Sequence, residues 1–461
     1  MKTMKVALLA TAALAAVSVS ARADDTAAIR AQLEALTARI AQLEAAPAVP
    51  VGFSLLTISE GSATVVPGLE PDKRFGNENA TIIGILPTAD APASATIEWS
   101  GYVRAAIYST DYEDNTDLGG ALFDADTTDT NVSTRAQINL TAKTDTAVGE
   151  VGMQMNLRGN VSVLDGDPNV SMQKGWGWWM MTPELTLGGG YAGSLGNIGE
   201  GYDGACTHCY MTDAADLGMN PGDSSQLRLS YASGPLAMAI AIEDATGGGF
   251  TPTSNGSPWH GGGADDLGVA AEVKYSGDVF GGEISGVYHD GSDLAAVNAP
   301  LDDISAGQPV ATAGESWQVG AGIHFNVMES TVLSFGAAIG QTQYDADYWA
   351  ATAVLEAGLT DTIHLELGAG YKSYDYGNVV TVPGGPPGPP VGASGFDRDT
   401  WGVMAGIYYE PVDQLTIGLE GEYSETNQDG CFSCAPLPLG IGAGDYEEHF
   451  STIALVTVYR F

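Results

Sequence analysis

The four cysteines are the residues of this chain whose type and spacing most directly suggest chemistry. They form two C-x-x-C units and are Cys206, Cys209, Cys431 and Cys434. Two such units, with His208 inside the first, could hold one tetrahedral zinc ion, whereas in an oxidising compartment they would form disulfides. Haem attachment is disfavoured because Tyr210, and not a histidine, follows Cys209.

The first residues of the chain favour the disulfides. Lys2 and Lys5 precede an apolar run that ends at Val19, and Ala21-Arg22-Ala23 has the small-x-small pattern of a cleavage site. We therefore expect residues 1–23 to be a secretory signal. Export places the cysteines in an oxidising compartment, so all four are disulfide candidates, and we expect no metal site and no cofactor.

A serine-rich block suggests hydrolysis only weakly. Gly222-Asp223-Ser224-Ser225 is similar to the nucleophile block of some hydrolases, and His449 follows Asp445. The Asp-x-x-His spacing that such a site needs is absent, and Gly-Asp-Ser is common where a loop meets a strand. We predict that the protein is not an enzyme, and an outer-membrane esterase is the weakest alternative.

The charge balance excludes one large class of partner. The chain has 461 residues, with 17 Lys and Arg against 57 Asp and Glu, a net charge of −40. Nucleic acid is a polyanion and needs a basic surface, so it is not an expected partner. Hydrophobic residues make up 44% and charged residues 16%, which argues against a disordered chain. The acidic excess favours cations.

Two segments precede the main body of the chain. Within residues 24–46, apolar residues recur at 4-3-4-3 spacing; they are Ile29, Leu33, Leu36, Ile40 and Leu43. This pattern predicts a periplasmic α-helix, either a short coiled coil between copies of the chain or an amphipathic helix against the same chain. Residues 47–94 contain several prolines and two short apolar runs. For that segment a linker, a plug and a short strand all stay open.

From residue 95 to residue 461 the hydrophobic period changes from 3.6 to 2. Between Arg135 and Lys143, for example, polar residues at odd positions alternate with apolar or small residues at even positions. Such alternation predicts strands with one apolar and one polar face. We predict sixteen strands, at 97–109, 133–145, 147–160, 176–182, 185–194, 225–232, 235–243, 267–276, 280–289, 315–326, 330–343, 347–359, 361–375, 398–410, 413–425 and 447–461.

The connections between these strands point to a barrel. Tight turns alternate with long polar connections, and the long ones are 110–132, 194–224, 244–266, 290–314, 376–397 and 426–446. Aromatic residues stand eight apart on the apolar face, as in Trp401 and Tyr409, close to the spacing of the aromatic girdles of outer-membrane barrels. We therefore predict an all-β fold, a transmembrane antiparallel β-barrel of about sixteen strands. A soluble β-sandwich is the alternative.

Several short pieces resemble a known family. Ser100-Gly101-Tyr102-Val103-Arg104, the run 239–244 and the alternation up to the terminal Phe461 are similar to alphaproteobacterial outer-membrane porins. The resemblance implies a sixteen-stranded homotrimeric porin in the bacterial outer membrane, in contact with lipid and lipopolysaccharide, that passes small hydrophilic solutes. The chain departs from the family at 188–190, where three glycines stand in a strand that commonly carries arginine.

The resemblance also implies where the pore is narrow. In such porins the loop after the fifth strand, here 194–224, folds into the barrel. Its acidic residues would face basic residues of the barrel wall across the constriction. The acidic candidates are Glu200, Asp203, Asp213 and Asp216, and the basic ones are Arg104, Arg135, Arg158 and Arg228. Opposed charges would order water and penalise apolar solutes. Alternatively, these arginines pair with nearby carboxylates only to satisfy a polar wall.

The expected function is that of a water-filled channel for small hydrophilic solutes and ions, with a preference for cations. A rival function keeps the barrel only as an anchor. In that case the acidic loops would bind divalent cations such as Ca²⁺ or Mg²⁺ and link the surface to lipopolysaccharide.

Overall fold

The computed structural model describes residues 56–69, 79–86, 94–114, 127–161, 169–199, 208–212, 222–244, 267–289, 316–341, 347–376, 381–382, 391–392, 396–430 and 446–461. The predicted signal (1–23) and the predicted helix (24–46) lie outside these residues. By their contacts the residues form two units, one of 58–82 and 97–461, and one of 1–57 and 83–96. No helix among the described residues is long and apolar enough to cross a bilayer.

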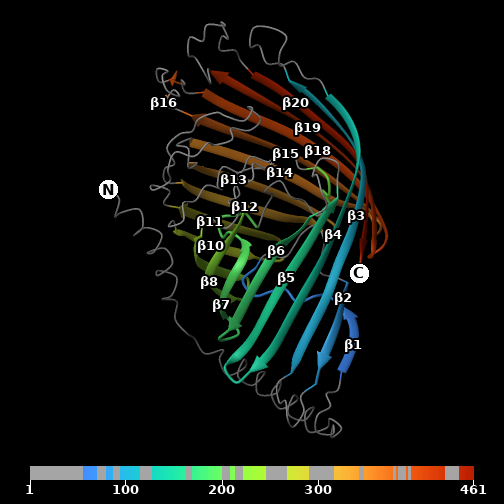
Figure 1. The fold of residues 1–461 in the computed structure, drawn as a ribbon, viewed down its shortest axis with the longest axis vertical. Coiled ribbons are helices and arrows are strands. Elements are labelled where there is room, and N and C mark those ends of the chain that lie inside the picture. The colour runs from blue at the N-terminus through green and yellow to red at the C-terminus, as the bar shows by residue number, and fades with distance from the viewer. Residues whose placement is uncertain are drawn as a thin grey trace. The chain divides into compact units, whose positions relative to one another are not determined.

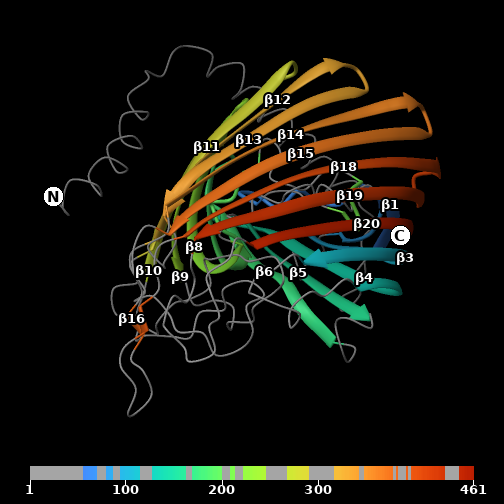
Figure 2. The same ribbon diagram turned by 90° about the horizontal axis from the view of Figure 1, so that it is seen from above.

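Sixteen antiparallel strands form a closed barrel (Figures 1 and 2). They are β3 (Ala95–Asp114), β4 (Thr127–Thr146), β5 (Gly149–Val161), β6 (Asn169–Met180), β7 (Leu185–Gly193), β8 (Asp223–Ser233), β9 (Leu236–Asp244), β10 (Leu267–Ser276), β11 (Phe280–His289), β12 (Ser316–Met328), β13 (Thr331–Gln341), β14 (Asp347–Thr360), β15 (Ile363–Tyr376), β18 (Phe396–Val412), β19 (Leu415–Gly430) and β20 (Tyr446–Arg460). Each pairs with its neighbour in the chain, and β20 pairs with β3 to close the barrel.

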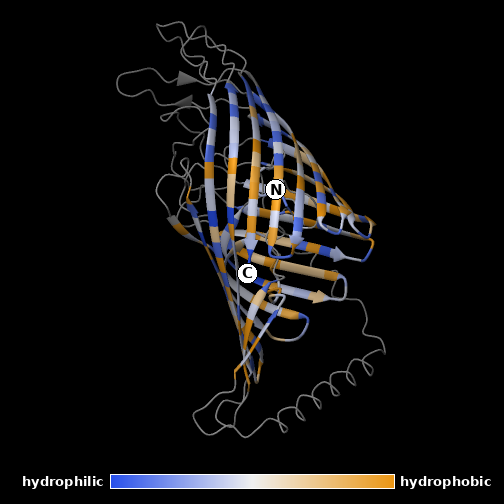
Figure 3. Cartoon of the chain, turned by 90° about the vertical axis from the view of Figure 1, so that its right-hand side faces the viewer, coloured by the Kyte–Doolittle hydropathy of each residue, from blue (hydrophilic) through white to orange (hydrophobic). Residues whose placement is uncertain are grey.

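The alternation in the sequence decides which face of each strand points outward. On β11, Glu283 is 4% exposed while the next residue, Ile284, is 65% exposed. The same alternation of polar and apolar residues runs along the other strands (Figure 3). Trp401 and Tyr409, predicted for the aromatic girdles, both lie on the exposed outer face. The apolar face therefore meets lipid, and the polar face lines the interior.

The predicted strands correspond one to one with those of the barrel. Several of them extend further toward the long loops than predicted, and β4 begins at Thr127 instead of residue 133. This extension carries no hydrophobic alternation, because its residues are mostly polar. Side chains pair across it instead: Thr128 Oγ1 donates to Asp111 Oδ1 (2.6 Å) and Thr130 Oγ1 to Ser109 Oγ (3.2 Å).

Four short strands lie outside the sixteen. β1 (Leu56–Gly61) and β2 (Ala80–Ile85) come from the segment 47–94, and they pair with each other. β16 (Thr381–Val382) and β17 (Val391–Gly392) form a small hairpin within the connection predicted at 376–397. A short strand was one of three alternatives that the sequence allowed for residues 47–94, where β1 and β2 lie. The hairpin of β16 and β17 was not predicted.

Candidate functional site: the interior wall and the loop between β7 and β8

The connection between β7 and β8, residues 194–222 and here called the inner loop, lies against the interior face of the barrel. Its described parts are 194–199, 208–212 and Gly222. They contact side chains of the polar inner faces of strands from β9 to β20 and of β3. The main anchors are four buried glutamates of the wall, each at most 4% exposed; they are Glu243, Glu283, Glu366 and Glu420.

The first part of the inner loop is held by β9 and β11. Glu243 accepts hydrogen bonds from Ser194 Oγ (2.6 Å) and from the backbone N–H of Leu195 (3.0 Å). Glu283 accepts one from the backbone N–H of Gly199 (2.7 Å). These carboxylates satisfy amides that would otherwise be buried without an acceptor.

Ile198 packs this part of the loop closely onto the wall. It is 1% exposed and belongs to a buried cluster with Ala338, Tyr348, Ala350 and Tyr374. A Cβ atom at Gly320 would lie only 2.9 Å from Ile198 Cγ1. The glycine on β12 therefore allows the loop and the wall to approach this closely.

The second part of the inner loop is held by β19 and β3. Glu420 accepts hydrogen bonds from the backbone N–H groups of Tyr210 (3.0 Å) and Met211 (2.8 Å) and from Thr212 Oγ1 (3.0 Å). Arg104 on β3 donates from Nη1 to the carbonyl oxygen of Tyr210. One carboxylate and one guanidinium thus fix this turn of the loop from two strands.

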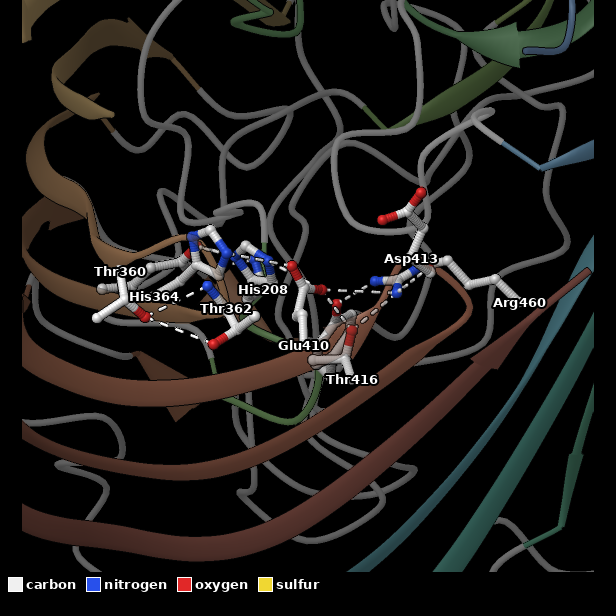
Figure 4. A network of polar contacts seen from close by, with 10 residues as sticks. His208, Thr360, Thr362, His364, Glu410, Asp413, Thr416 and Arg460 are labelled. Atoms are coloured by element: carbon white, nitrogen blue, oxygen red, sulfur yellow. Dashed lines mark hydrogen bonds and ion pairs between the residues drawn. The ribbon is translucent and has the colours of Figure 1, made fainter. Parts of the chain in front are cut away.

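His208 lies in a polar network at the same place (Figure 4). Its Nδ1 is 2.6 Å from Glu366 Oε1, and its Nε2 is 3.4 Å from Glu410 Oε1. Glu410 also lies 3.3 Å from His364 Nε2 and 3.6 Å from Arg460 Nη1. The loop histidine is therefore placed between two carboxylates of the wall.

These carboxylates change the protonation of His208. Burial alone would lower its pKa, but the hydrogen bonds and charges of Glu366 and Glu410 outweigh burial and raise the pKa to about 9. The protonated form therefore stabilises the attached loop fully below about pH 6.5, and this contribution is lost as the pH rises through about 9. Burial raises the pKa of Tyr210 to about 12, so Tyr210 stays neutral over this range.

We expect the inner loop to loosen when the pH is raised from about 7 to about 10, because His208 then loses its proton and its attraction to both carboxylates. Single-channel recordings check this, since a loosened loop makes the open-channel current noisier. His208→Gln should be noisy at both pH values and should lose the pH dependence. A pH dependence that is unchanged in His208→Gln would mean that another group is responsible.

Two of the four predicted arginines are buried and hold segments of backbone. Arg104 contacts the inner loop at Tyr210, as described above. Arg228 on β8 donates from Nη2 to the carbonyl oxygen of Gly193 (2.7 Å) and from Nη1 to that of Gly68 (2.5 Å). Both arginines therefore fix segments that lie on the inner wall.

The other two predicted arginines lie half-buried on the inner faces of β4 and β5. Arg135 Nε donates to Asn160 Oδ1 (2.7 Å), and Arg158 Nε donates to Gln137 Oε1 (2.8 Å). Lys174 on β6 is the next lumen-facing base, paired in register with Asn156 of β5. The acceptors Asn160 and Gln137 are neutral amides and do not cancel the charges of Arg135 and Arg158, whereas Asp223 interacts electrostatically with Arg158 and Lys174.

Charge is unequally distributed around the interior. The middle of β3 to β8 carries bases on its inner face; they are Arg104, Arg135, Arg158, Lys174 and Arg228. The four buried glutamates stand on β9, β11, β15 and β19, where they outnumber the buried base Lys274 on β10, whose Nζ is 3.6 Å from Glu283 Oε2. Among the acids of these strands, β3 to β8, Glu98 and Glu150 lie near the ends with short turns, and Asp223 at the start of β8 interacts electrostatically with Lys174 and Arg158. Such a distribution sets up a field across the lumen, which orders water and disfavours apolar solutes.

The glycines at 188–190 have a local explanation. The Trp176 ring is 2% exposed, and a Cβ atom at Gly188 would lie 2.4 Å from it. Arg228 also covers the ring, since its Cζ is 5.3 Å from the ring centroid. The space that an arginine on β7 would need is therefore occupied by a tryptophan from β6 and an arginine from β8.

Most of the predicted loop residues fall outside the described part of the chain. These are Glu200, Asp203, Asp213, Asp216, Cys206, Cys431 and Cys434. Cys209 is described and is disulfide-bonded, and its partner lies outside the described residues. The role of the four acids and the pairing of the cysteines therefore stay predictions.

The residues of the esterase alternative do not come together. Ser224 lies on the inner face of β8, where it contacts Gln226, and His449 lies on β20, where its Nδ1 is 2.8 Å from Tyr423 Oη. Strands β3 to β7 separate β8 from β20 in the barrel. Among the described residues, one group offers ligand atoms to a metal within 4.8 Å of one another: Glu425, Glu447 and His449.

The sequence reasoning missed the wall glutamates. The alternation in the sequence places Glu366 and Glu420 on the polar faces of their strands but does not indicate what they bind. Both follow a glycine or histidine on the same inner face, at His364 and Gly418. An acid in the middle of a lumen-facing row is a usable signal, because a carboxylate there needs donors that the neighbouring strands do not supply.

Comparisons with known proteins agree with this geometry. Residues 95–443 match the family described as the porin subfamily. No curated protein matches the sequence. Among solved structures, the chain is similar to OmpTdeltaL8, a loop-deletion mutant of the outer membrane protein OmpT of Vibrio cholerae (11% identity, 80% of this chain and 99% of that chain, TM-score 0.49).

Two further structures are similar at the same level. The outer membrane channel DcaP of Acinetobacter baumannii has 14% identity over 80% of this chain and 97% of that chain, with a TM-score of 0.48. An anion-selective porin from Comamonas acidovorans has 11% identity over 80% and 100%, with a TM-score of 0.45. Since all three TM-scores are below 0.5, the family assignment rests on the match over residues 95–443. The chain therefore belongs to the porin subfamily and is a channel protein of the bacterial outer membrane.

Proposed function

We propose that the protein forms a water-filled channel through which small hydrophilic solutes and ions diffuse passively, and that cations pass more readily than anions. The observation that carries this proposal is the polar, charged inner wall with the inner loop held against it. A polar, charged wall of this kind is wetted, so dissolved solutes can diffuse along it. The net charge of −40 supports the cation preference, because fixed negative charge raises the local concentration of cations.

Solute flux into liposomes tests the diffusion part of this proposal. Purified protein in liposomes should admit small neutral sugars at rates that fall steadily with solute size, because passage through water depends on size. Protein-free liposomes are the control. If the liposomes admit no sugar at any size, the proposed diffusion function is wrong.

The partners follow from the same proposal. We propose a homotrimer embedded in outer-membrane lipid and lipopolysaccharide, as the resemblance to the alphaproteobacterial porins implies. In the oxidising periplasm, disulfides among Cys206, Cys209, Cys431 and Cys434 would close the loops that carry them.

A further inference from the structure

A segment upstream of the barrel strands, Ser62–Leu69, also lies on the inner wall. At its start, Glu98 Oε2 accepts a hydrogen bond from the Thr64 backbone N–H (2.5 Å), and Lys143 Nζ donates to Thr64 Oγ1 (2.6 Å). Glu98 is 4% exposed, whereas its neighbour Trp99 on the outer face is 47% exposed. Thr64 is therefore fixed to the interior faces of β3 and β4.

The end of the segment is fixed to β6, β7 and β8. Val66 and Leu69 belong to a buried cluster that also contains Trp176, Trp178 and Ala192. Trp176 and Trp178 are 2% and 3% exposed, whereas their neighbour Trp179 is 37% exposed and lies on the outer face of β6. The two buried tryptophans therefore point toward the interior of the barrel. The backbone of the segment is held as well, since Arg228 donates to the Gly68 carbonyl oxygen as described above.

A tight turn brings the segment close to β8. The Leu69 N–H donates to the Val66 carbonyl oxygen (3.1 Å), and Gly68 has a φ of 77°. A Cβ atom at Gly68 would lie 2.5 Å from Ser230 Oγ. Both the backbone conformation and the close approach require glycine here. The turn is therefore built to lie on the wall.

One side chain of the segment faces away from the wall. Val65 is 60% exposed, although both its neighbours, Thr64 and Val66, contact inward-facing residues of the barrel. In an extended stretch, neighbouring side chains point in opposite directions. Val65 therefore points toward the lumen.

We propose that Ser62–Leu69 is a second pore-lining element, which narrows the channel near the ends of the strands joined by short turns. The segment contacts the inner wall between β3 and β8. The inner loop contacts the wall from β9 to β20 and also at Arg104 on β3. Val65 is the residue of the segment that permeating ions meet. This proposal rests on the proposed function, because it concerns the same channel.

Charge placed at Val65 tests the proposal. Full-length Val65→Lys and Val65→Glu are reconstituted in planar bilayers, and the reversal potential is measured in a KCl gradient. A unit charge about 10 Å away in water changes the energies of K⁺ and Cl⁻ by about 0.4 kcal/mol each, in opposite directions, so the K⁺ to Cl⁻ permeability ratio should change by up to about four-fold at low salt. Val65→Lys should lower the ratio, and Val65→Glu should raise it.

Val148→Lys provides the matched control, because Val148 stands in the tight turn between β4 and β5, is 63% exposed, and accepts a hydrogen bond at its carbonyl oxygen from Nε1 of Trp179 on the outer face. It should keep the reversal potential of the wild type. If the wild type conducts and both Val65 variants match it, Ser62–Leu69 does not line the pore. If the wild type does not conduct, the proposed function itself fails, which is a distinguishable result.

Discussion

Glu420→Gln should convert a steady single-channel current into one that fluctuates between levels. The carboxylate of Glu420 accepts three hydrogen bonds, from Tyr210, Met211 and Thr212. A glutamine of the same shape directs an NH₂ group, itself a donor, at one or more of these donors. Each buried donor left without an acceptor costs roughly 1–3 kcal/mol. Since about 1.4 kcal/mol is a tenfold change in an equilibrium, the detached loop should become at least several-fold more populated.

The control for this prediction is Glu150→Gln. Glu150 on β5 also lies in the interior, but its hydrogen bond comes from Trp178 Nε1 (3.2 Å). The Glu150→Gln variant removes the same charge as Glu420→Gln but does not alter a contact of the described parts of the inner loop. We therefore expect a steady current from Glu150→Gln. Equal noise in the two variants, or a steady current in both, would show that Glu420 does not hold the loop.

The double variant Arg135→Gln/Arg158→Gln should make the channel markedly more cation-preferring. Both guanidinium groups lie half-buried on the inner face, and glutamine retains a hydrogen-bond donor for Asn160 and Gln137. Removing two positive charges about 10 Å from the ion path changes the energies of K⁺ and Cl⁻ by about 0.8 kcal/mol each, in opposite directions, so the K⁺ to Cl⁻ ratio should rise by up to about fifteen-fold at low salt and by less where salt screens the charges. The reversal potential in a KCl gradient measures this change.

The variant Arg135→Lys/Arg158→Lys separates charge from shape, because lysine keeps the positive charge and loses the planar guanidinium. It should retain the reversal potential of the wild type. An equal shift in the Lys and Gln variants would mean that the geometry of the two side chains, and not their charge, sets the selectivity. No shift in the Gln variant would place both arginines outside the ion path.

The barrel could be predicted from the sequence because a single rule, hydrophobic period 2, acts along every strand. Ile284 beside Glu283 is exposed because lipid, and not a protein core, covers the outer face. The ends of the strands could not be predicted in the same way. The extension of β4 to Thr127 depends on hydrogen bonds to the neighbouring strand, and these leave no pattern in a single sequence.

The site was predictable only in part. The inward position of the loop followed from the family resemblance, and the basic faces of β4 and β5 followed from the alternation. The contacts of the loop could not be predicted, because they join residues such as His208 and Glu366 that are far apart in the chain. The position of Ser62–Leu69 could not be predicted for the same reason. The segment contains Pro67 and Gly68 and has no hydrophobic periodicity that would indicate a strand or a helix.

The reversal potential of the wild-type channel tests the central claim most directly. A single-channel recording with different KCl concentrations on the two sides of a planar bilayer gives it in one experiment. We expect a potential whose sign shows that K⁺ is more permeable than Cl⁻. A potential of the opposite sign, or the absence of any conductance, would contradict it.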